Sequence, residues 1–250
     1  MKDLLLRALD RRADAGVPVQ LWMRDDDAVS PSGTLDRLLR LTEDQKIPLT
    51  LAVIPKFAGP TLAKSLLSLH NVTVAVHGWG HINHAGPNEK KQELGAHRSL
   101  ATVLDELKHG FDHLHQLFPS KFTPVLVPPW NRIAPVVIAA LPNLGFKAVS
   151  IFGKETIAAL PMVNTHVDLM DWRSTRGGRS FDVLFAELAA EVGRGGPVGF
   201  LTHHLDHDAR AWEFIELLIA LTVDHSGCYW TSLPSLLPSP RLPRNHQTKV

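Results

Sequence analysis

Several features that would place a protein outside the cell, in a membrane or on nucleic acid are absent from this sequence. The single cysteine, Cys228, cannot form an internal disulfide, and we expect it to be a core or strand residue. The 26 basic and 25 acidic side chains nearly cancel, so no net charge favours nucleic acid or an anionic membrane surface. No apolar run approaches the length of a membrane span.

The N-terminal segment also lacks the pattern of a secretory signal. Its apolar residues are interrupted by Asp3, Arg7 and Asp10, which leaves no apolar core and no cleavage site. We therefore predict a cytoplasmic protein with a small-molecule partner, and its oligomeric state stays open. With 250 residues and 44% apolar composition, we predict one domain over residues 1–237. The proline-containing residues 238–250 are predicted to form a disordered tail.

Helical and strand-like patterns alternate along the chain. Strands are predicted where apolar runs end at turn-forming residues, over 17–23, 49–54, 72–76, 123–127, 147–151, 163–167, 198–201 and 229–232. Helices are predicted from apolar periodicity over 3–15, 34–46, 60–69, 89–118, 181–192 and 209–221. A strand followed by a helix, about seven or eight times over, is typical of parallel strands closed into an α/β barrel.

The stretch after the third predicted strand carries the strongest chemical signal. His77 and His81 are four residues apart in HGWGH, directly after a β-branched run. About one such pair is expected by chance in this chain, so its position at a strand end is what gives it weight. Together with the carboxylates of Asp25, Asp26 and Asp27, the pair indicates a divalent metal held by an acid and two imidazoles.

Four further polar clusters follow other predicted strands. They are RDDDA (24–28) after the first, VPPWNR (127–132) after the fourth, DLMDW (168–172) after the sixth and LTHH (201–204) after the seventh. In (β/α) barrels the catalytic groups lie on the loops after the strands, because these loops converge on one face. We therefore predict that all five clusters share one rim of the barrel.

The adjacent carboxylates impose a condition on the backbone. In a regular strand Asp25 and Asp27 lie on one face and Asp26 lies on the other. Asp26 and Asp27 can serve one site only if the chain turns at this point, and their charges require a cation nearby. A solvated acidic turn is the alternative interpretation.

The order of these motifs resembles that of the polysaccharide deacetylases of carbohydrate esterase family 4, the NodB-like deacetylases, over about residues 18–205. RDDDA is similar to the family's TFDDG, HGWGH to H-[ST]-x-x-H, DLMDW to D-x-x-D-W, and LTH to L-x-H. The resemblance implies an α/β fold, an irregular (β/α)7-8 barrel of the NodB-like type. It also implies a metal-dependent hydrolase that removes an acetyl group from an N-acetylated sugar or oligosaccharide.

The resemblance implies a metal centre and a general base. It places the metal on Asp27, His77 and His81, and the base on Asp26. Zn²⁺ is the expected cofactor, and Co²⁺, Ni²⁺, Fe²⁺ or Mn²⁺ fit the same nitrogen and oxygen ligands. His84 is a second candidate ligand, although a loop histidine bonded to backbone is the simpler interpretation.

A general acid is implied on the opposite side of the site. The resemblance assigns it to His203, with His204 as the competing candidate, and makes Asp168 the acid's orienting partner, with Asp171 as the alternative. The tryptophans of the rim could stack on sugar faces or pack at the barrel mouth. The candidate substrate-binding residues are Trp79, Pro129, Trp130, Arg132, Asp171 and Trp172.

The motifs depart from the family pattern at three positions. Val127 stands where the family's RPPY motif has the arginine that orients the base, and Arg24 or Arg132 could supply that group. Gly78 replaces the usual serine or threonine, and Ala28 replaces a glycine. We therefore predict a divergent member whose substrate the sequence does not assign.

Two other functions fit the same residues. One is a metal-dependent amidohydrolase that acts on a small non-sugar amide or formamide, because a fold does not decide the substrate. The other is a catalytically silent, carbohydrate-binding relative, because loss of the orienting arginine could misplace the base.

Overall fold

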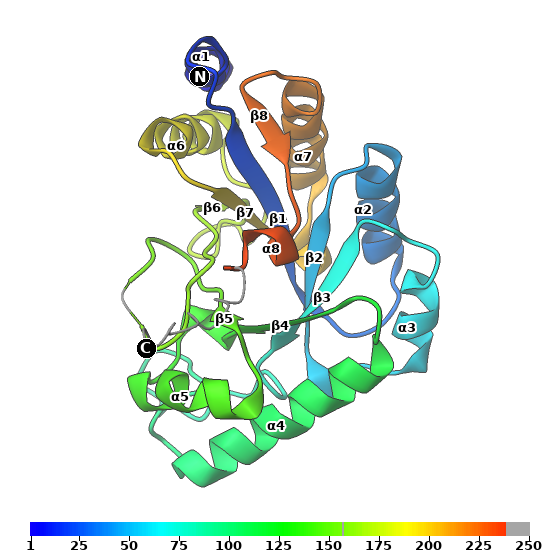
Figure 1. Cartoon of the computed structure of the whole chain (residues 1–250), viewed down its shortest axis with the longest axis vertical. Helices are drawn as coiled ribbons and strands as arrows, with labels where there is room; N and C mark the ends of the chain where they lie inside the picture. Colours follow the sequence, from blue (N-terminus) through cyan, green and yellow to red (C-terminus); the bar gives the residue numbers. More distant parts are fainter. Residues whose placement is uncertain (157, 239–250) are drawn as a thin grey trace, which may run out of the picture.

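Figure 1 shows the computed structural model of the chain, which describes residues 1–156 and 158–238. All but the first residue of the predicted tail lies outside the described residues. The strands are β1 (Val19–Ala28), β2 (Leu49–Val53), β3 (Val72–His77), β4 (Phe122–Val127), β5 (Ala148–Val149), β6 (Val167–Asp168), β7 (Val198–Thr202) and β8 (Cys228–Trp230). The α-helices are α1 (Lys2–Asp14), α2 (Gly33–Asp44), α3 (Pro60–Leu66), α4 (Leu100–Leu117), α5 (Pro135–Ala140), α6 (Phe181–Arg194), α7 (Ala209–Thr222) and α8 (Leu233–Leu236). Short 3-10 turns are η1 (Pro55–Phe57), η2 (Pro129–Asn131), η3 (Leu141–Leu144) and η4 (His204–Asp206).

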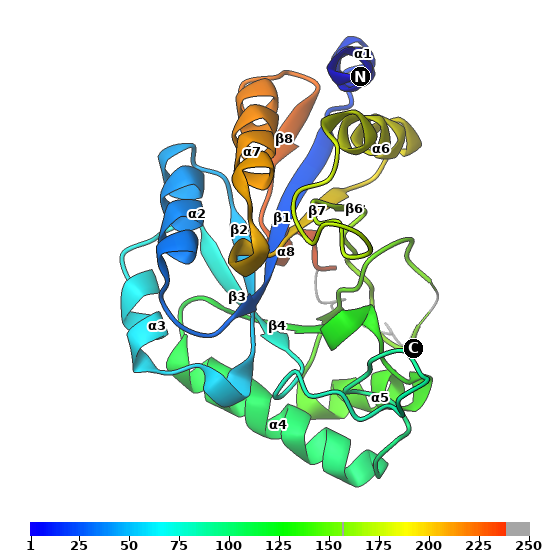
Figure 2. The ribbon, with the colours of Figure 1, turned by 180° about the vertical axis from the view of Figure 1, so that it is seen from behind.

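The described strands form one curled, parallel sheet with most of the helices packed around its outer side (Figures 1 and 2). Its order is β5-β4-β3-β2-β1-β7-β6, and β8 pairs with the first residues of β1. Isolated parallel bridges, Val149 to Met162 and Phe152 to Thr165, connect the two ends of this sheet. The predicted irregular α/β barrel is therefore confirmed, and its closure by bridges explains why the strand predicted over 163–167 is reduced to β6.

The barrel interior is filled mainly by one large side chain. Trp22 is fully buried there, and alanines at Ala52, Ala75 and Ala148 leave room for its ring. The neighbouring residues in β1, Leu21 and Met23, point outward into the larger core between sheet and helices. Because alternation continues along β1, the next interior position after Trp22 is residue 24, at the rim.

Two boundaries differ from the predicted ones in a way that concerns the site. β1 continues through the acidic cluster to Ala28 instead of ending before it. The helix predicted from residue 89 begins at Leu100, because the Ser99 hydroxyl accepts the backbone N–H of Thr102 and caps it there. Residues 89–99 are instead part of a loop over the end of β3.

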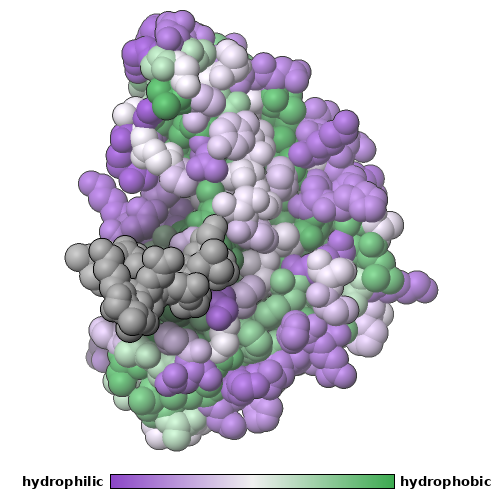
Figure 3. Space-filling model, in the orientation of Figure 1, coloured by the Kyte–Doolittle hydropathy of each residue, from purple (hydrophilic) through white to green (hydrophobic). Residues whose placement is uncertain are grey.

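Across the described residues, no helix has both the length and the apolar composition needed to cross a membrane. Figure 3 shows hydrophilic side chains over much of the visible face, with smaller apolar areas between them. Burial raises the pKa of the Cys228 thiol to about 11, as expected for a core residue.

Candidate active site

The end of β1 departs from regular alternation at the acidic cluster. The pairing of β1 with β2 shifts register between Asp25 and Ala28, and Asp27 has a φ of 72°. This bulge re-aims the Asp27 side chain, so that Asp26 and Asp27 both line one pocket. The turn that a shared site requires is therefore present.

Asp27, His77 and His81 form a group that could hold a metal ion. Asp27 Oδ1 lies 3.1 Å from His77 Nε2 and 3.3 Å from His81 Nε2, and the three ligand atoms lie within 4.8 Å of one another. Neighbouring ligand atoms around a tetrahedral zinc are about 3.3 Å apart, because the bonds are about 2.0–2.1 Å long. The donor set and spacing therefore fit a divalent metal, and His84 lies outside this group.

The contacts of these residues orient them around one position. His77 Nδ1 donates to the Val127 carbonyl at 2.9 Å, and its Nε2 faces Asp27. Burial acts to lower the pKa of His77, but the hydrogen bond to Asp27 and the charges of Asp26 and Asp27 raise it. Burial acts to raise the pKa of Asp27, but the hydrogen bond and charge of His77 and the charge of His81 outweigh it, and the pKa falls well below its usual range. Burial lowers the pKa of His81, which keeps that imidazole neutral.

The loop that carries His81 is held by a buried carboxylate. Glu93 is 1% exposed and accepts the backbone N–H groups of Trp79, Gly80 and Ile82 at 3.1, 2.8 and 3.3 Å. A Cβ at Gly78 would lie 2.0 Å from Glu93 Oε2, so the serine or threonine of the family motif has no room here. Sequence reasoning missed Glu93, and the unusual Gly78 was the signal that could have pointed to it.

Of the two candidate arginines, Arg24 is the one that pairs with Asp26. Its guanidinium is fully buried and pairs with both oxygens of Asp26, with Nε to Oδ1 at 2.8 Å and Nη2 to Oδ2 at 3.0 Å. It also donates to Ser150 Oγ at 2.7 Å and to Asn131 Oδ1 at 3.3 Å. Arg132, the other candidate, donates to the Lys91 carbonyl instead.

His203 faces Asp26 from β7. Its Nε2 lies 3.9 Å from Asp26 Oδ2, too far for a direct hydrogen bond, so that a single oxygen atom between them would be within reach of both. The predicted hydrogen bond to an orienting acid is not made among the described residues, where His203 Nδ1 is buried and unpartnered. Asp168 and Asp171 both have other partners.

The carboxylates of Asp168 and Asp171 accept hydrogen bonds from groups other than His203. Asp168 accepts the indole N–H of Trp172 at 2.8 Å and the backbone N–H of Met170 at 2.9 Å, and burial raises its pKa. The Trp172 ring in turn packs edge-on against His203, with centroids 4.6 Å apart. Asp171 accepts the backbone N–H of Ser174 at 3.1 Å. Trp172 therefore contacts both Asp168 and His203, and the predicted orienting role of Asp168 stays a prediction.

The competing histidine has a different position. His204 is 1% exposed, and its Nδ1 lies 2.5 Å from Asp25 Oδ1, while its backbone N–H donates to Asp25 Oδ2 at 2.8 Å. Burial raises the pKa of Asp25, and His204 reduces that effect. This buried pair joins the ends of β1 and β7 and lies outside the pocket lining, which leaves His203 as the histidine that faces the base.

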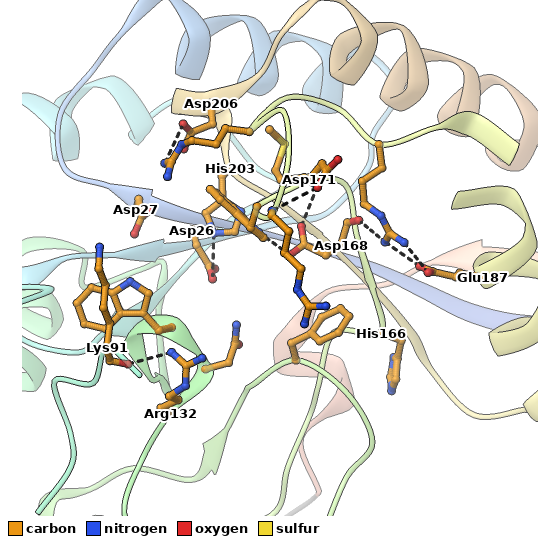
Figure 4. A pocket seen from close by; sticks show the side chains of 18 of the residues that line it. Asp26, Asp27, Lys91, Arg132, His166, Asp168, Asp171, Glu187, His203 and Asp206 are labelled. Atoms are coloured by element: carbon orange, nitrogen blue, oxygen red, sulfur yellow. Dashed lines mark hydrogen bonds and ion pairs between the residues drawn. The ribbon is translucent and has the colours of Figure 1, made fainter. Parts of the chain in front are cut away.

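The pocket around these residues has a volume of about 1380 Å³ (Figure 4). Trp130, Arg132, Asp171 and Trp172 line it, as the sequence predicted for substrate-binding residues. Trp79 does not: after the turn at Gly78 its ring faces His109 on α4, with centroids 6.4 Å apart. Pro129 packs against Gly78 and is buried behind the pocket.

Comparisons with known proteins give different results for the sequence of the chain and for its fold. No protein-family model matches the chain, and no curated protein matches it significantly. Solved structures do match: a family 4 carbohydrate esterase from Streptomyces lividans in complex with acetate has a TM-score of 0.58 at 17% identity, covering 89% of this chain and 97% of that one. The Bc1960 peptidoglycan N-acetylglucosamine deacetylase has a TM-score of 0.61 at 15% identity, covering 89% and 90%.

The fold is that of the NodB-like family 4 carbohydrate esterases. The same fold also occurs without activity, since a mutant of BA3943, a CE4 family pseudoenzyme, matches at a TM-score of 0.61 and 16% identity, covering 90% of this chain and 69% of that one. The prediction of a divergent NodB-like member is therefore confirmed at the level of the fold. What this chain does has to be argued from its own residues.

Proposed function

We propose that the protein is a metal-dependent deacetylase that hydrolyses the acetamide of an N-acetylated sugar or oligosaccharide. The observation that carries this proposal is the juxtaposition of the Asp27, His77 and His81 group with the carboxylate of Asp26 and the imidazole of His203. A hydrolysis needs a metal position, a base and an acid around one reacting carbon, and these five side chains supply them.

The base is the part of this mechanism that the chain prepares most fully. When bound, a divalent metal, which we propose to be Zn²⁺, supplies Lewis acidity toward the acyl oxygen and the attacking water. Asp26 takes the proton of that water. Because Arg24 pairs with both Asp26 oxygens, the carboxylate is fixed in one orientation.

The acid completes the reaction from the other side of the pocket. An amine is a poor leaving group, so its nitrogen has to be protonated as the bond to the acyl carbon breaks. His203 Nε2 faces Asp26 across 3.9 Å and donates its own proton to that nitrogen, and the proton that Asp26 took from the water then replaces it. The backbone N–H of Trp130, which follows two prolines that have none, is the candidate donor to the developing oxyanion.

Two observations favour this function over its alternatives. The pocket volume of about 1380 Å³ exceeds the roughly 300–1,000 Å³ of ordinary small-molecule sites, which favours a sugar or oligosaccharide over a small amide. A silent relative was expected if no arginine oriented the base, and Arg24 supplies one.

The test is acetate release by protein loaded with one equivalent of zinc, using N-acetylglucosamine oligomers and small amides in parallel. We expect release from the sugars by the wild type and none from Asp26→Asn, which should still bind the metal. Hydrolysis of small amides alone would make the protein an amidohydrolase. Equal, background rates for both proteins on every substrate would make it a silent relative.

A further inference from the structure

The pocket extends from the metal position across a wall of basic side chains. Lys91 and Arg132 both line the pocket, and Arg132 Nη1 donates to the Lys91 carbonyl at 2.9 Å (Figure 4). Arg173 lines the same pocket from the loop after β6. A group of cations at one pocket is not a consequence of the overall charge, because the chain as a whole carries a net charge of only +1.

Every carboxylate that lines the pocket has a partner of its own. Four of them are paired with arginines: Glu187 with Arg179, Glu191 with Arg194, Asp206 with Arg176, and Asp26 with Arg24. Asp27 faces the metal histidines, and Asp168 and Asp171 accept N–H groups. By contrast, Lys91, Arg132 and Arg173 form no ion pair with any described residue. Lys91, Arg132 and Arg173 are therefore the cations of the pocket lining whose side chains are not held by a carboxylate in the described part of the chain.

The two cations on the Trp130 side are close to the reacting position. The Trp130 ring lies 4.3 Å from the ring of the metal-ligating candidate His81, centroid to centroid, and Lys91 Nζ lies 6.0 Å from the Trp130 centroid. Trp130 has a φ of 55°, an unusual conformation for a large residue and one that occurs at functional sites. Trp130 therefore lies near both the metal position and Lys91, whose backbone carbonyl accepts a hydrogen bond from Arg132.

We propose that the substrate carries an anionic group, a carboxylate or a phosphate, which Lys91 and Arg132 bind beside the reacting acetamide. The proposal rests on the deacetylase function and narrows its substrate class to acidic N-acetylated amino sugars. Arg132 uses one Nη atom on the Lys91 carbonyl, so its Nε and other Nη remain for two parallel hydrogen bonds to a carboxylate or phosphate. Lys91 adds a point charge to the same group.

The test compares matched substrates with the zinc-loaded protein. N-acetylglucosamine is the neutral probe, N-acetylmuramic acid carries a carboxylate, and N-acetylglucosamine 6-phosphate carries a phosphate. The double variant Lys91→Gln/Arg132→Gln is compared with Arg40→Gln/Lys64→Gln, which removes the same charge from exposed positions outside the pocket. The readouts are kcat/KM for acetate release and, separately, the Kd of each sugar by calorimetry.

We expect the wild type to prefer at least one acidic sugar over the neutral one. The pocket variant should lose about ten- to a hundredfold in kcat/KM and in affinity for that sugar, mainly through KM, and little for the neutral one. The control variant should keep the preference. Whichever acidic sugar depends on Lys91 and Arg132 identifies the group as carboxylate or phosphate.

Failure of this proposal is distinct from failure of the proposed function. Equal kcat/KM for neutral and acidic sugars, or an equal loss on all of them in the pocket variant, would overturn the anionic substrate while leaving a deacetylase. If no sugar is hydrolysed but the acidic ones still bind in a manner that depends on Lys91 and Arg132, the anion site stands and the deacetylase function falls.

Discussion

The two walls of the pocket are organised to different degrees. On the metal side, the His77 ring is bonded to the Val127 carbonyl, Asp26 to Arg24, and the His81 loop to Glu93. On the acid side, His203 Nδ1 is buried without a partner among the described residues, and Trp172 beside it is 38% exposed. The difference teaches that Asp26, His77 and the His81 loop are each held by hydrogen bonds within the fold, whereas the His203 ring lacks such a bond at Nδ1.

The largest expected effect comes from removing one member of each wall. His77→Ala deletes a ligand, so we expect metal content to fall from about one equivalent to none and acetate release to disappear. His203→Ala should keep the metal and lose about 10²- to 10⁴-fold in kcat, because only proton donation is removed. Elemental analysis and kinetics on the same samples measure both. Loss of metal from both variants would contradict the separation of the two walls.

The second effect tests whether Arg24 orients the base. Arg24→Gln should lower kcat about a hundredfold with the metal retained, because the Asp26 carboxylate is no longer held in place. Trp22, Val125 and Val127 all face the barrel interior, so an arginine at 127 could enter the same space. We expect Arg24→Gln/Val127→Arg to recover part of kcat. Thermal unfolding of each variant is the control, and a rate loss that merely follows stability would count against a positioning role.

A smaller effect should follow from loosening the metal loop. Glu93→Gln removes one acceptor from the three backbone N–H groups, so His81 is less firmly placed, and we expect the affinity for zinc to fall about ten- to a hundredfold. Glu89→Gln is the matched control, since Glu89 lies in the same loop but is exposed. Competition with a zinc chelator measures both. Unchanged affinity in Glu93→Gln would mean that the loop is held by other contacts.

The smallest effect concerns His207, which follows η4 and lies outside the pocket lining. Burial, assisted by the charges of His204 and His203, lowers the pKa of His207 to about 3. An unfolded histidine has a pKa of about 6.5, so between these values the unfolded chain binds a proton that the folded chain does not. Stability should therefore fall as the pH falls from 7.5 to 5.5, by about 1 kcal/mol from this residue.

Urea unfolding at the two pH values measures this contribution. His207→Gln should lose less stability on acidification than the wild type, because it removes the buried imidazole. His70→Gln, at an exposed position, is the control and should behave like the wild type. If His207→Gln and the wild type lose the same stability on acidification, the pH dependence of the unfolding free energy comes from another group.

The order of strands and the meeting of the polar clusters could be predicted because the ends of parallel strands converge. Asp27, His77 and His81 follow from that rule once the chain turns at Asp27. Glu93 could not be predicted, because apolar periodicity continued the helix of Leu100 back across its position. The contact between His203 and Trp172 could not be predicted either, because the D-x-x-D-W motif does not reveal that the tryptophan itself donates a hydrogen bond to Asp168.

The choice between Arg24 and Arg132 illustrates a second kind of limit. Both lie in a polar cluster that follows a predicted strand, and the sequence alone does not say toward which face either side chain points. Only the direction of each side chain decides between them, and that direction depends on the alternation of β1, in which Arg24 shares the interior face with Trp22.

The position of Arg24 has a consequence for how such chains are found. The interior of a barrel is one volume that several strands enter, so a guanidinium can reach the same carboxylate from β1 or from β4. Evolution can then exchange the strand that donates the arginine while the arrangement of charges in space is conserved. A pattern written along the chain scores Val127 as a loss, whereas a template of atoms in three dimensions would score Arg24 as a match. Among distant members of this fold, activity is better judged by what occupies the interior than by which motif still contains its letters.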